Sequence, residues 1–444
     1  MSKIQMVEVK ENSGQEKQDL LFIMYAEGAD TMGAITRCRV CHSGNITNVL
    51  SLGDQYLAVF TAEDSKPEKY PLDVVLCEDC YLVQLQHTTP RSSLYTENYG
   101  YKSGINTTIK SDLAEIAQRA IKEVEKPHSV INTLDIGAND GTLLTFYPEH
   151  YCRVACEPIK KFAKECKQKG IKVINDFFSY EAVKQKISGQ FDIITAISCF
   201  YDLDDPNKFV SDIVRLFADK GVFIVQQNYL VAMLKQNAFD NIVHEHLEFY
   251  SLLALENLLE RHGLEVYRVE QNTINGGSFR TYIQHKGVRL VEQSVIDMRE
   301  EEQQLKLDDP QIYADFAVRV KKRAEILHTF IEKKVREGKT SYLYGASTRG
   351  NTLLQFAGLD NHLVKAAVER NPEKWGKKIA SVGIPIISEE QARKEHPDYM
   401  LCLPWFFFFP EMREREEAYI QAGGKFILPL PNPVLVTKEG NVKL

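Results

Sequence analysis

The sequence predicts an α/β protein whose centre is a doubly wound parallel sheet. Three observations support this prediction. Strand-like apolar runs alternate with helical patterns over residues 105–287, as in INTLDI, CRVACE and FDIITAI. A second, smaller alternation indicates a C-terminal Rossmann-like α/β domain over residues 339–444. Two CxxC pairs precede both and indicate a small metal-binding domain over residues 35–104.

Two further segments precede or connect these domains. Residues 1–34 are polar and of mixed charge, and we expect a flexible extension with no assigned role. Residues 288–338 are charged and helix-periodic, so we expect a helical connector between the two α/β domains. Its charged run REEE, at residues 299–302, is expected to form a solvated face of that connector.

The composition favours a folded protein that acts on a small molecule. Of the 444 residues, 44% are hydrophobic, and 54 basic against 61 acidic residues give a net charge of −7. This charge disfavours binding to a phosphate backbone, so no nucleic-acid partner is expected. No apolar run approaches about eighteen residues and the N-terminus lacks a secretory pattern, which predicts a cytoplasmic protein without a membrane partner. We expect a monomer or a small homo-oligomer.

Nine cysteines, an odd number, favour reduced thiols or metal ligands over a disulfide framework. Cys38 and Cys41 form one CxxC pair, Cys77 and Cys80 form the other, and 35 residues separate the pairs. Each pair can place two thiolates at neighbouring corners of a tetrahedron about 2.3 Å from Zn²⁺, and two pairs fill the coordination shell. The quartet therefore predicts a structural Zn²⁺ site. A redox dithiol is the alternative, and it would require two such pairs to arise separately.

A glycine loop, DIGANDG, follows the first strand of the central sheet and precedes an expected helix. It contains Asp135, Gly137, Asn139 and Gly141. Glu157 ends the expected second strand, where a carboxylate suits the two hydroxyls of a ribose. Because the third glycine of GxGxxG is missing, the loop is similar to the S-adenosylmethionine (SAM) loop of class I methyltransferases rather than to an NAD site. A glycine-loop oxidoreductase is the alternative.

Further candidates for SAM binding stand at the ends of later strands. Asp176 and Phe177 follow the third strand and are expected near the adenine. Ser198 and Phe200 end the fourth strand and are expected to face the same crevice. For Asp176 a turn position, and for Phe200 a core position, is equally consistent with the sequence.

Three consecutive ionisable residues, His244, Glu245 and His246, lie past the fifth strand between apolar flanks, where burial is costly without a function. A metal site is disfavoured, because histidines at i and i+2 diverge on a helix and two ligands hold a metal weakly. Acid–base catalysis fits better, since a neutral imidazole with a pKa of about 6.5 can take a proton from a carbon beside a carbonyl. Two structural histidines with satisfied hydrogen bonds are the alternative.

Methylation of carbon requires such a base. The sulfonium methyl of SAM is already electrophilic, but a C–H bond becomes a nucleophile only after its proton is removed. The enolate oxygen that results needs a hydrogen-bond donor such as a tyrosine hydroxyl or an amide N–H. Two alternatives remain open: O- or N-methylation with the same base, and a zinc-ribbon binding protein with an inactive SAM fold.

Together these features resemble the nucleotide-sugar C-methyltransferases, whose type members are the 3-C-methyltransferases of dTDP-linked 4-keto-deoxysugars. The resemblance runs from about residue 37 to residue 436 and also rests on the motifs ENYGYKSG (97–104), NGGS (275–278), YGASTRGN (344–351), LPW (403–405) and PLPNP (429–433). It implies a class I methyltransferase sheet, a zinc-binding N-terminal domain, and SAM-dependent methylation of a nucleotide-linked keto-deoxysugar.

The resemblance also implies roles for single residues. His246 would be the base that removes the proton from the sugar carbon, and Glu245 would orient it or tune its charge. Tyr99 or Tyr101 of the YGY stretch would sit at the substrate. The C-terminal domain would help to hold the nucleotide-sugar, with the glycine loop at Gly345 as a contributor.

The sequence departs from the antibiotic-sugar members of that family at two places. Val243 stands where they carry a tyrosine just before the His-Glu-His segment. Tyr201 and Asp202 stand where many methyltransferases have a histidine after the fourth strand. The identity of the acceptor therefore depends on which groups replace the missing hydroxyl.

Overall fold

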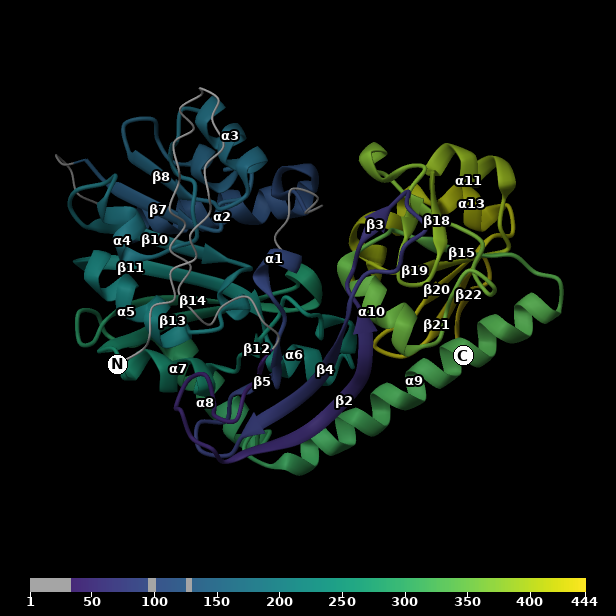
Figure 1. Ribbon diagram of the computed structural model, residues 1–444, viewed down its shortest axis with the longest axis horizontal. Helices are drawn as coiled ribbons and strands as arrows, with labels where there is room; N and C mark the ends of the chain where they lie inside the picture. The colour runs from purple at the N-terminus through teal and green to yellow at the C-terminus, as the bar shows by residue number, and fades with distance from the viewer. Residues whose placement is uncertain (1–32, 95–100, 125–129) are drawn as a thin grey trace, which may run out of the picture.

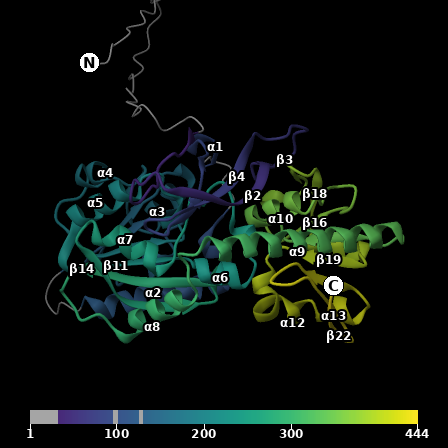
Figure 2. The ribbon, with the colours of Figure 1, turned by 90° about the horizontal axis from the view of Figure 1, so that it is seen from below.

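The computed structural model describes residues 33–94, 101–124 and 130–444 (Figure 1). Two α/β units lie side by side, and the long helix α9 (Pro310–Arg336) runs along the lower edge of the C-terminal unit (Figures 1 and 2). Most of the expected N-terminal extension, residues 1–32, lies outside the described residues, and the first strand is β1 (Gly33–Ala34).

The central sheet has seven strands in the order β9-β8-β7-β10-β11-β14-β13. The first five are parallel, and β14 (Ser278–His285) runs antiparallel to both β11 and β13. In chain order the strands therefore lie 3-2-1-4-5-7-6, which confirms the predicted doubly wound sheet of a class I methyltransferase. The other strands are β7 (Asn132–Ile136), β8 (Cys152–Cys156), β9 (Lys172–Ile174), β10 (Phe191–Ile197), β11 (Phe217–Asn228) and β13 (Leu264–Asn272).

Helices cover both faces of this sheet, which explains why β10 is apolar along almost its whole length. Ile194 of β10 packs in one core with α5 (Pro206–Leu216), and Ile193 packs on the opposite face with α2 (Thr107–Glu123). The helix α5 begins where the side chain of Asp205 accepts a hydrogen bond from the backbone N–H of Lys208. The remaining helices of the unit are α3 (Lys160–Gln168), α4 (Tyr180–Lys184), α6 (Leu230–Lys235) and α7 (Leu252–Glu260).

The N-terminal unit is bonded into both of its neighbours. Its sheet has the order β12-β5-β4-β2, and β12 (Glu248–Phe249) comes from the chain directly after the His-Glu-His segment. In the other direction, β3 (Phe60–Thr61) pairs with β17 (Lys378–Ile379) of the C-terminal unit. The other strands are β2 (Ile46–Tyr56), β4 (Lys69–Cys77) and β5 (Val83–Leu85), and β1 pairs with β6 (His87–Thr88).

The C-terminal unit confirms the second, Rossmann-like α/β domain. Its parallel strands lie in the order β20-β19-β15-β16-β18, and β21, β22, β17 and β3 extend the sheet at its edges. Its elements are β15 (Ser341–Tyr344), α10 (Thr348–Phe356), β16 (Ala367–Glu369), β18 (Ile384–Ser388), α11 (Glu389–Glu395), β19 (Tyr399–Cys402), α13 (Glu417–Gln421), β20 (Lys425–Leu428), β21 (Val434–Thr437) and β22 (Gly440–Lys443).

The helix α9 joins the units through one apolar stripe. Its buried residues recur every three or four positions, which places them on one face of the helix: Tyr313, Phe316, Val320, Ala324, Leu327 and Ile331. This stripe belongs to one core with Leu50 of β2 and Leu343 of β15. The N-terminal and C-terminal sheets are therefore packed against the same helix.

The sequence predicts that the charged run of the connector forms a solvated face. The structure differs, because one residue of the run is buried. Glu302, in α8 (Gln293–Gln304), is only 3% exposed. Its carboxylate accepts hydrogen bonds from the backbone N–H groups of Leu252 (2.7 Å) and Leu253 (2.9 Å) and from the hydroxyl of Tyr229 (2.8 Å). A carboxylate at these positions satisfies the first N–H groups of α7 and lies at the positive end of its dipole.

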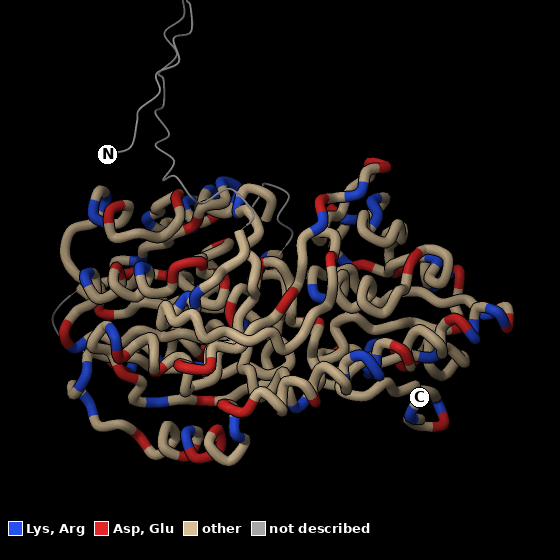
Figure 3. Tube along the Cα trace, turned by 60° about the horizontal axis from the view of Figure 1, so that its bottom comes forward, with Lys and Arg blue, Asp and Glu red and all other residues tan. Residues whose placement is uncertain are grey.

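Among the described residues, none of the helices combines the length and the apolar character needed to cross a bilayer. Basic and acidic residues are interspersed along the traced chain (Figure 3).

Replacing Glu302 by Ala is expected to destabilise the protein by about 3–5 kcal/mol, because two backbone N–H groups and a buried hydroxyl lose their acceptor. Urea denaturation measures the effect. The matched control is Glu300→Ala on the same helix, where the side chain is exposed and the expected change is below about 0.5 kcal/mol. Equal effects of the two substitutions would contradict the proposed capping role.

Candidate active site and metal centre

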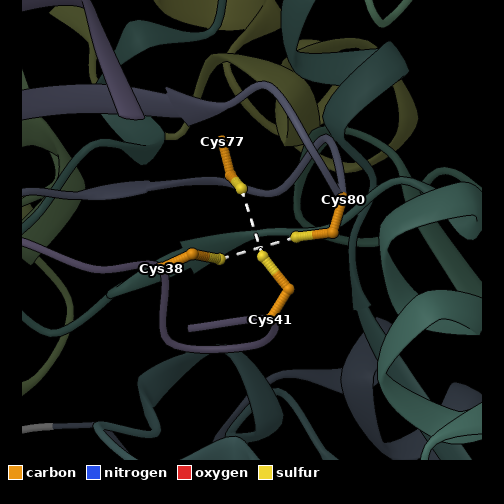
Figure 4. A group of neighbouring side chains, drawn as sticks. All are labelled: Cys38, Cys41, Cys77 and Cys80. Carbon is orange, nitrogen blue, oxygen red and sulfur yellow. Dashed lines mark hydrogen bonds between the residues drawn. The ribbon is translucent and has the colours of Figure 1, made fainter. Parts of the chain in front are cut away.

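The four cysteines of the two CxxC pairs meet at one point (Figure 4). Their sulfur atoms all lie within 4.8 Å of one another, with Cys38 Sγ 3.5 Å from Cys80 Sγ and Cys41 Sγ 3.4 Å from Cys77 Sγ. Thiolates held about 2.3 Å from Zn²⁺ in a regular tetrahedron are about 3.8 Å apart, so the quartet fits this ion. The hydrogen bond from Cys80 lowers the pKa of the Cys38 thiol to about 5.

The two CxxC turns have the same backbone form. The N–H of His42 donates to the carbonyl of Cys38 (3.0 Å), and the N–H of Tyr81 donates to the carbonyl of Cys77 (2.9 Å). His42 and Tyr81, each directly after its pair, have φ values of +60° and +61°. The left-handed residue reverses the chain after each pair, so both thiols of a pair point to the same side.

Both glycines of the central loop are required by the local geometry. Gly137 has a φ of +69°, and a Cβ there would lie 3.1 Å from Cys199 Sγ. Gly141 has a φ of +74°, and its Cβ would lie 2.9 Å from Cys166 Sγ. The expected helix after the loop is replaced by a short 3₁₀ turn, Leu143–Phe146. Just before it, the side chain of Asp140 accepts hydrogen bonds from the backbone N–H and the hydroxyl of Thr142.

A cleft with a free volume of about 120 Å³ lies beside this loop at the carboxyl ends of the central strands. We call it the cofactor cleft. The five predicted SAM residues that line it are Asp135, Gly137, Asn139, Glu157 and Ser198. The two carboxyl oxygens of Glu157 accept the N–H groups of Asn139 and Ile159, both at 2.8 Å, and the hydroxyl of Thr195 donates to Asp135 (2.6 Å). Burial raises the pKa of Asp135 and of Glu157 to about 7.

The other four predicted SAM residues do not line the cofactor cleft. Gly141 packs against α3, and Asp176 and Phe177 are exposed on the loop after β9, where Arg91 lies 5.6 Å from the centre of the Phe177 ring. We expected Phe200 to face the crevice. Its ring is instead fully buried against Phe209 and Tyr250. The short 3₁₀ turn Phe200–Asp202 rotates this ring into the core.

A buried polar network that the sequence did not indicate forms another wall of the cofactor cleft. Asp112 and Gln226 both line the cleft. Arg280 donates to Asp112 (2.8 Å) and to Gln226 (2.8 Å), and Gln226 also donates to Asp112 (2.5 Å). Burial raises the pKa of Asp112, although Arg280 opposes that shift. These residues come from α2, β11 and β14, and only the fold brings them together.

His246 is held in one tautomer by the chain just before it. Its Nδ1 lies 2.8 Å from the carbonyl oxygen of Asn241. A carbonyl only accepts hydrogen bonds, so Nδ1 carries the proton and Nε2 keeps its lone pair. Burial lowers the pKa of His246 to about 3, and the positive charge of Arg349 acts in the same direction. The imidazole is therefore neutral at neutral pH.

The other predicted catalytic residues have different surroundings. His244 is buried, and its Nε2 lies 3.1 Å from the carbonyl oxygen of Tyr70 in β4. Glu245 is partly buried, and burial raises its pKa. The contact that orients His246 comes from Asn241 rather than from Glu245. Tyr101 lines the cofactor cleft, and its carbonyl accepts from the Asn139 amide (3.2 Å).

Tyr99, the other tyrosine of the YGY stretch, lies outside the described residues.

The ring of His246 lines a small cavity with a free volume of about 10 Å³, about the space of one water molecule, which we call the acceptor pocket. Its lining residues are Tyr201, Asn228, Tyr229, Leu230, Met233, His246, Glu248 and Phe249. The acceptor pocket adjoins the cofactor cleft. Tyr201 lines the acceptor pocket, and the next residue, Asp202, lines the cofactor cleft. In β11, Asn228 lines the acceptor pocket and Gln226, two residues before it, lines the cofactor cleft. The His-Glu-His segment thus borders a cavity next to the cleft.

The C-terminal unit reaches this segment through Arg349. The guanidinium donates to the Asp240 carboxylate (2.9 Å) and to the Asn275 carbonyl (2.6 Å). The indole N–H of Trp405 donates to the same Asp240 oxygen (3.1 Å). Three motifs far apart in the sequence, NGGS, YGASTRGN and LPW, therefore meet beside His246.

Three protein-family models match the chain in succession. They are described as a zinc binding domain, over residues 38–95, a methyltransferase domain, over residues 106–269, and a C-methyltransferase C-terminal domain, over residues 273–431. C-methyltransferase NovU of Streptomyces niveus is 29% identical over 421 residues, which are 93% of this chain and 100% of NovU.

Solved methyltransferases match about two fifths of the chain. The mitomycin 7-O-methyltransferase MmcR is 16% identical with a TM-score of 0.32, and the match covers 40% of this chain and 54% of MmcR, about half of its length. A SAM-dependent methyltransferase of Clostridium acetobutylicum is 14% identical with a TM-score of 0.33, over 41% of this chain and 93% of that one.

Replacing Cys80 by Ser is expected to release the metal, because three thiolates leave one corner of the tetrahedron to a weak ligand. Metal analysis of the purified protein should give about one Zn²⁺ per chain for the wild type and much less for the variant, with a lower unfolding temperature. The control is Cys152→Ser, a partly exposed thiol outside the quartet. A Cys80→Ser protein that kept its full zinc content would contradict the assignment.

The affinity for SAM is expected to depend on pH. The folded protein holds Asp135 and Glu157 protonated up to a pKa of about 7, so it loses stability as the pH rises through that value. The carboxylates formed there attract the sulfonium and ammonium groups of SAM. Binding measured by calorimetry should therefore tighten about three- to tenfold between pH 6 and pH 7.5.

Two controls isolate this effect. Asp135→Asn should reduce the pH dependence to the part that Glu157 contributes, and adenosine, which lacks both cationic groups but keeps the ribose, should depend on pH more weakly than SAM does. A dependence that is unchanged in Asp135→Asn would refute the role of this carboxylate.

Proposed function

We propose that this chain, which matches the methyltransferase and C-methyltransferase family models and is 29% identical to C-methyltransferase NovU, methylates a carbon beside a ketone in a nucleotide-linked deoxysugar, with His246 as the base. SAM is the methyl donor, and Zn²⁺ occupies the four-cysteine site. The observation that carries the proposal is the fixed tautomer of His246. The hydrogen bond to the Asn241 carbonyl leaves Nε2 as the basic nitrogen of a neutral ring that lines the acceptor pocket.

The residues of the chain divide the work between two neighbouring cavities. Asp135 and Glu157 line the cofactor cleft. There Asp135 would bind the cationic amino-acid part of SAM, and Glu157 would bind its ribose. When bound, SAM supplies a methyl group on a sulfonium, which the substrate carbon takes as the C–S bond breaks and leaves its electron pair on sulfur. His246 removes the proton from that carbon first, because a C–H bond has no lone pair to offer.

The low pKa of His246 in the free protein does not prevent this step. Negative charge develops on the substrate oxygen as the proton moves, and an opposite charge a few ångströms away raises the pKa of the imidazole. Arg349, which lowers the pKa of His246, already has the Asp240 carboxylate as its partner. The base therefore gains strength only when an acidic substrate is present.

The nucleotide is proposed to contact the C-terminal unit. The glycine loop after β15 places Gly345 at a φ of +88° and begins α10, with the Ser347 side chain as its cap. A loop of this form before a helix suits a phosphate. The first turn of the same helix supplies Arg349, whose contact with Asp240 supports a shared site for the two units.

His246→Asn is expected to abolish proton exchange at the substrate carbon, by at least about 10²-fold, since asparagine offers no basic nitrogen. The probe is a dTDP-linked 4-keto-6-deoxyhexose in deuterium oxide without SAM, followed by NMR. The affinity for SAM should change less than about twofold, and His150→Asn, an exposed histidine, is the control.

Two results would count against the proposal. Exchange that persists in His246→Asn would show that another group is the base. A wild-type protein that binds SAM but exchanges no proton of the ketone would favour methylation of oxygen or nitrogen instead of carbon.

A further inference from the structure

Glu248 is a second ionisable side chain that lines the acceptor pocket with His246. It is the first residue of β12, where it pairs with Gln84 of β5, and it is only 1% exposed. Both of its carboxyl oxygens are buried, and no described residue makes a hydrogen bond to either of them. A buried carboxyl without partners costs free energy, so its position in a pocket points to a group that binds there.

Two other polar side chains of the acceptor pocket donate hydrogen bonds to partners outside it. The amide nitrogen of Asn228 donates to the Asn241 side chain (3.0 Å), and the hydroxyl of Tyr229 donates to Glu302 (2.8 Å). Tyr201 has interactions of its own and turns its ring toward His246, with the ring centres 4.4 Å apart. The remaining residues, Leu230, Met233 and Phe249, are apolar.

The groups that face Glu248 do not give it a charged partner. Arg39, from the first CxxC turn, donates to the Leu85 carbonyl (2.6 Å) and the Thr88 hydroxyl (2.9 Å), and it lies 3.5 Å from Asp204. No described cation lies within 4 Å of the Glu248 carboxyl. The other charged or titratable groups around it are His246, Asp202, Asp204, Cys38 and Tyr250.

This environment favours the un-ionised acid. Burial raises the pKa of Glu248 well above its usual range, Asp202 and Asp204 act in the same direction, and only Arg39 opposes them. With four thiolates around Zn²⁺ nearby, the local charge becomes more negative and not less. An un-ionised Glu248 carries an O–H that it can donate.

We propose that Glu248 is the hydrogen-bond donor that binds the carbonyl oxygen of the acceptor and stabilises the enolate oxygen formed from it. This inference rests on the proposed function, because it needs a ketone in the acceptor pocket. Glu248 and His246 then act on opposite ends of the same carbonyl system, with Glu248 at the oxygen and His246 at the neighbouring C–H.

The proton balance of this step closes within the pocket. Nε2 of His246 takes the proton, the electron pair of the C–H bond forms a carbon–carbon double bond, and the carbonyl pair moves onto oxygen. The O–H of Glu248 donates to that oxygen. When the carbon attacks the methyl group, the carbonyl re-forms, the proton of Glu248 stays on Glu248, and His246 keeps the proton that it took.

The test compares two substitutions of nearly equal size. Glu248→Gln keeps a neutral donor, and Glu248→Leu removes it. With the same dTDP-linked 4-keto-6-deoxyhexose, Glu248→Gln should exchange the substrate proton within about fivefold of the wild-type rate. Glu248→Leu should lose about 10²–10³-fold, the effect of removing one donor to an oxyanion. Both variants should bind SAM within about twofold of the wild type, which verifies that they are folded.

An infrared measurement tests the protonation state without a substrate. The difference spectrum of wild type minus Glu248→Gln at neutral pH should contain the carbonyl stretch of an un-ionised carboxylic acid. A carboxylate band in its place would overturn the inference, and so would equal loss of exchange in the two variants. If the wild type itself exchanges no proton, the proposed function fails, and this inference fails with it. If the wild type exchanges the proton but both variants lose exchange equally, only this inference fails.

Discussion

One buried carboxylate joins the two α/β units beside His246. Asp240 is 1% exposed and accepts hydrogen bonds from Arg349 and Trp405, which belong to the C-terminal unit. A charge buried this deeply is stable only while its partner stays in place. The next residue in the chain, Asn241, offers the carbonyl that sets the tautomer of His246. The position of the C-terminal unit is therefore coupled to the chemistry of a side chain in the central unit.

The N-terminal unit contributes in a similar way from the other side. Its sheet takes β12 from the central unit as a fourth strand, and its β3 extends the sheet of the C-terminal unit. The zinc quartet lies in the turns that flank this sheet, and the Arg39 side chain beside it bonds Gln84 and Leu85 of β5. Because β5 pairs with β12, the side chain of Arg39 links the first CxxC turn to the strand that carries Glu248.

Local patterns predicted the features that depend on neighbouring residues. The two CxxC pairs, the two α/β alternations, and the strand, loop and acid at Glu157 each have a mechanism that acts over a few residues or one supersecondary unit. Five of the nine predicted SAM residues line the cofactor cleft. Phe200 differs because one turn decides whether its ring faces the crevice or the core.

Long-range partners could not be predicted in this way. Glu302 belongs to a charged run that is typical of a solvated helix, and only the packing of α8 under α7 gives it three donors. The Asp112–Gln226–Arg280 network joins residues up to 168 positions apart. Glu248 follows a motif that draws attention to its histidines, and nothing in the sequence marks it as buried. In each case an element distant in the chain determines the burial and the hydrogen-bond partners of a polar residue.

In the proposed reaction, the charge balance of the acceptor pocket gives a reason for a base that is weak in the free protein. Before the reaction the imidazole, the proposed Glu248 acid and the ketone are all neutral, and one positive charge lies on the sulfonium. After methyl transfer that charge has moved to the imidazolium of His246, so the total charge is unchanged while its position shifts across the boundary between the two cavities.

The enolate no longer exists at that stage, and burial again disfavours the protonated ring, whose pKa is about 3 in the free protein. The imidazolium is then a strong acid against neutral water, and it loses its proton once solvent reaches the pocket. A base with the ordinary pKa of about 6.5 would stay protonated for a larger fraction of time. The same burial that makes His246 weak without substrate therefore returns it to the neutral form for the next cycle.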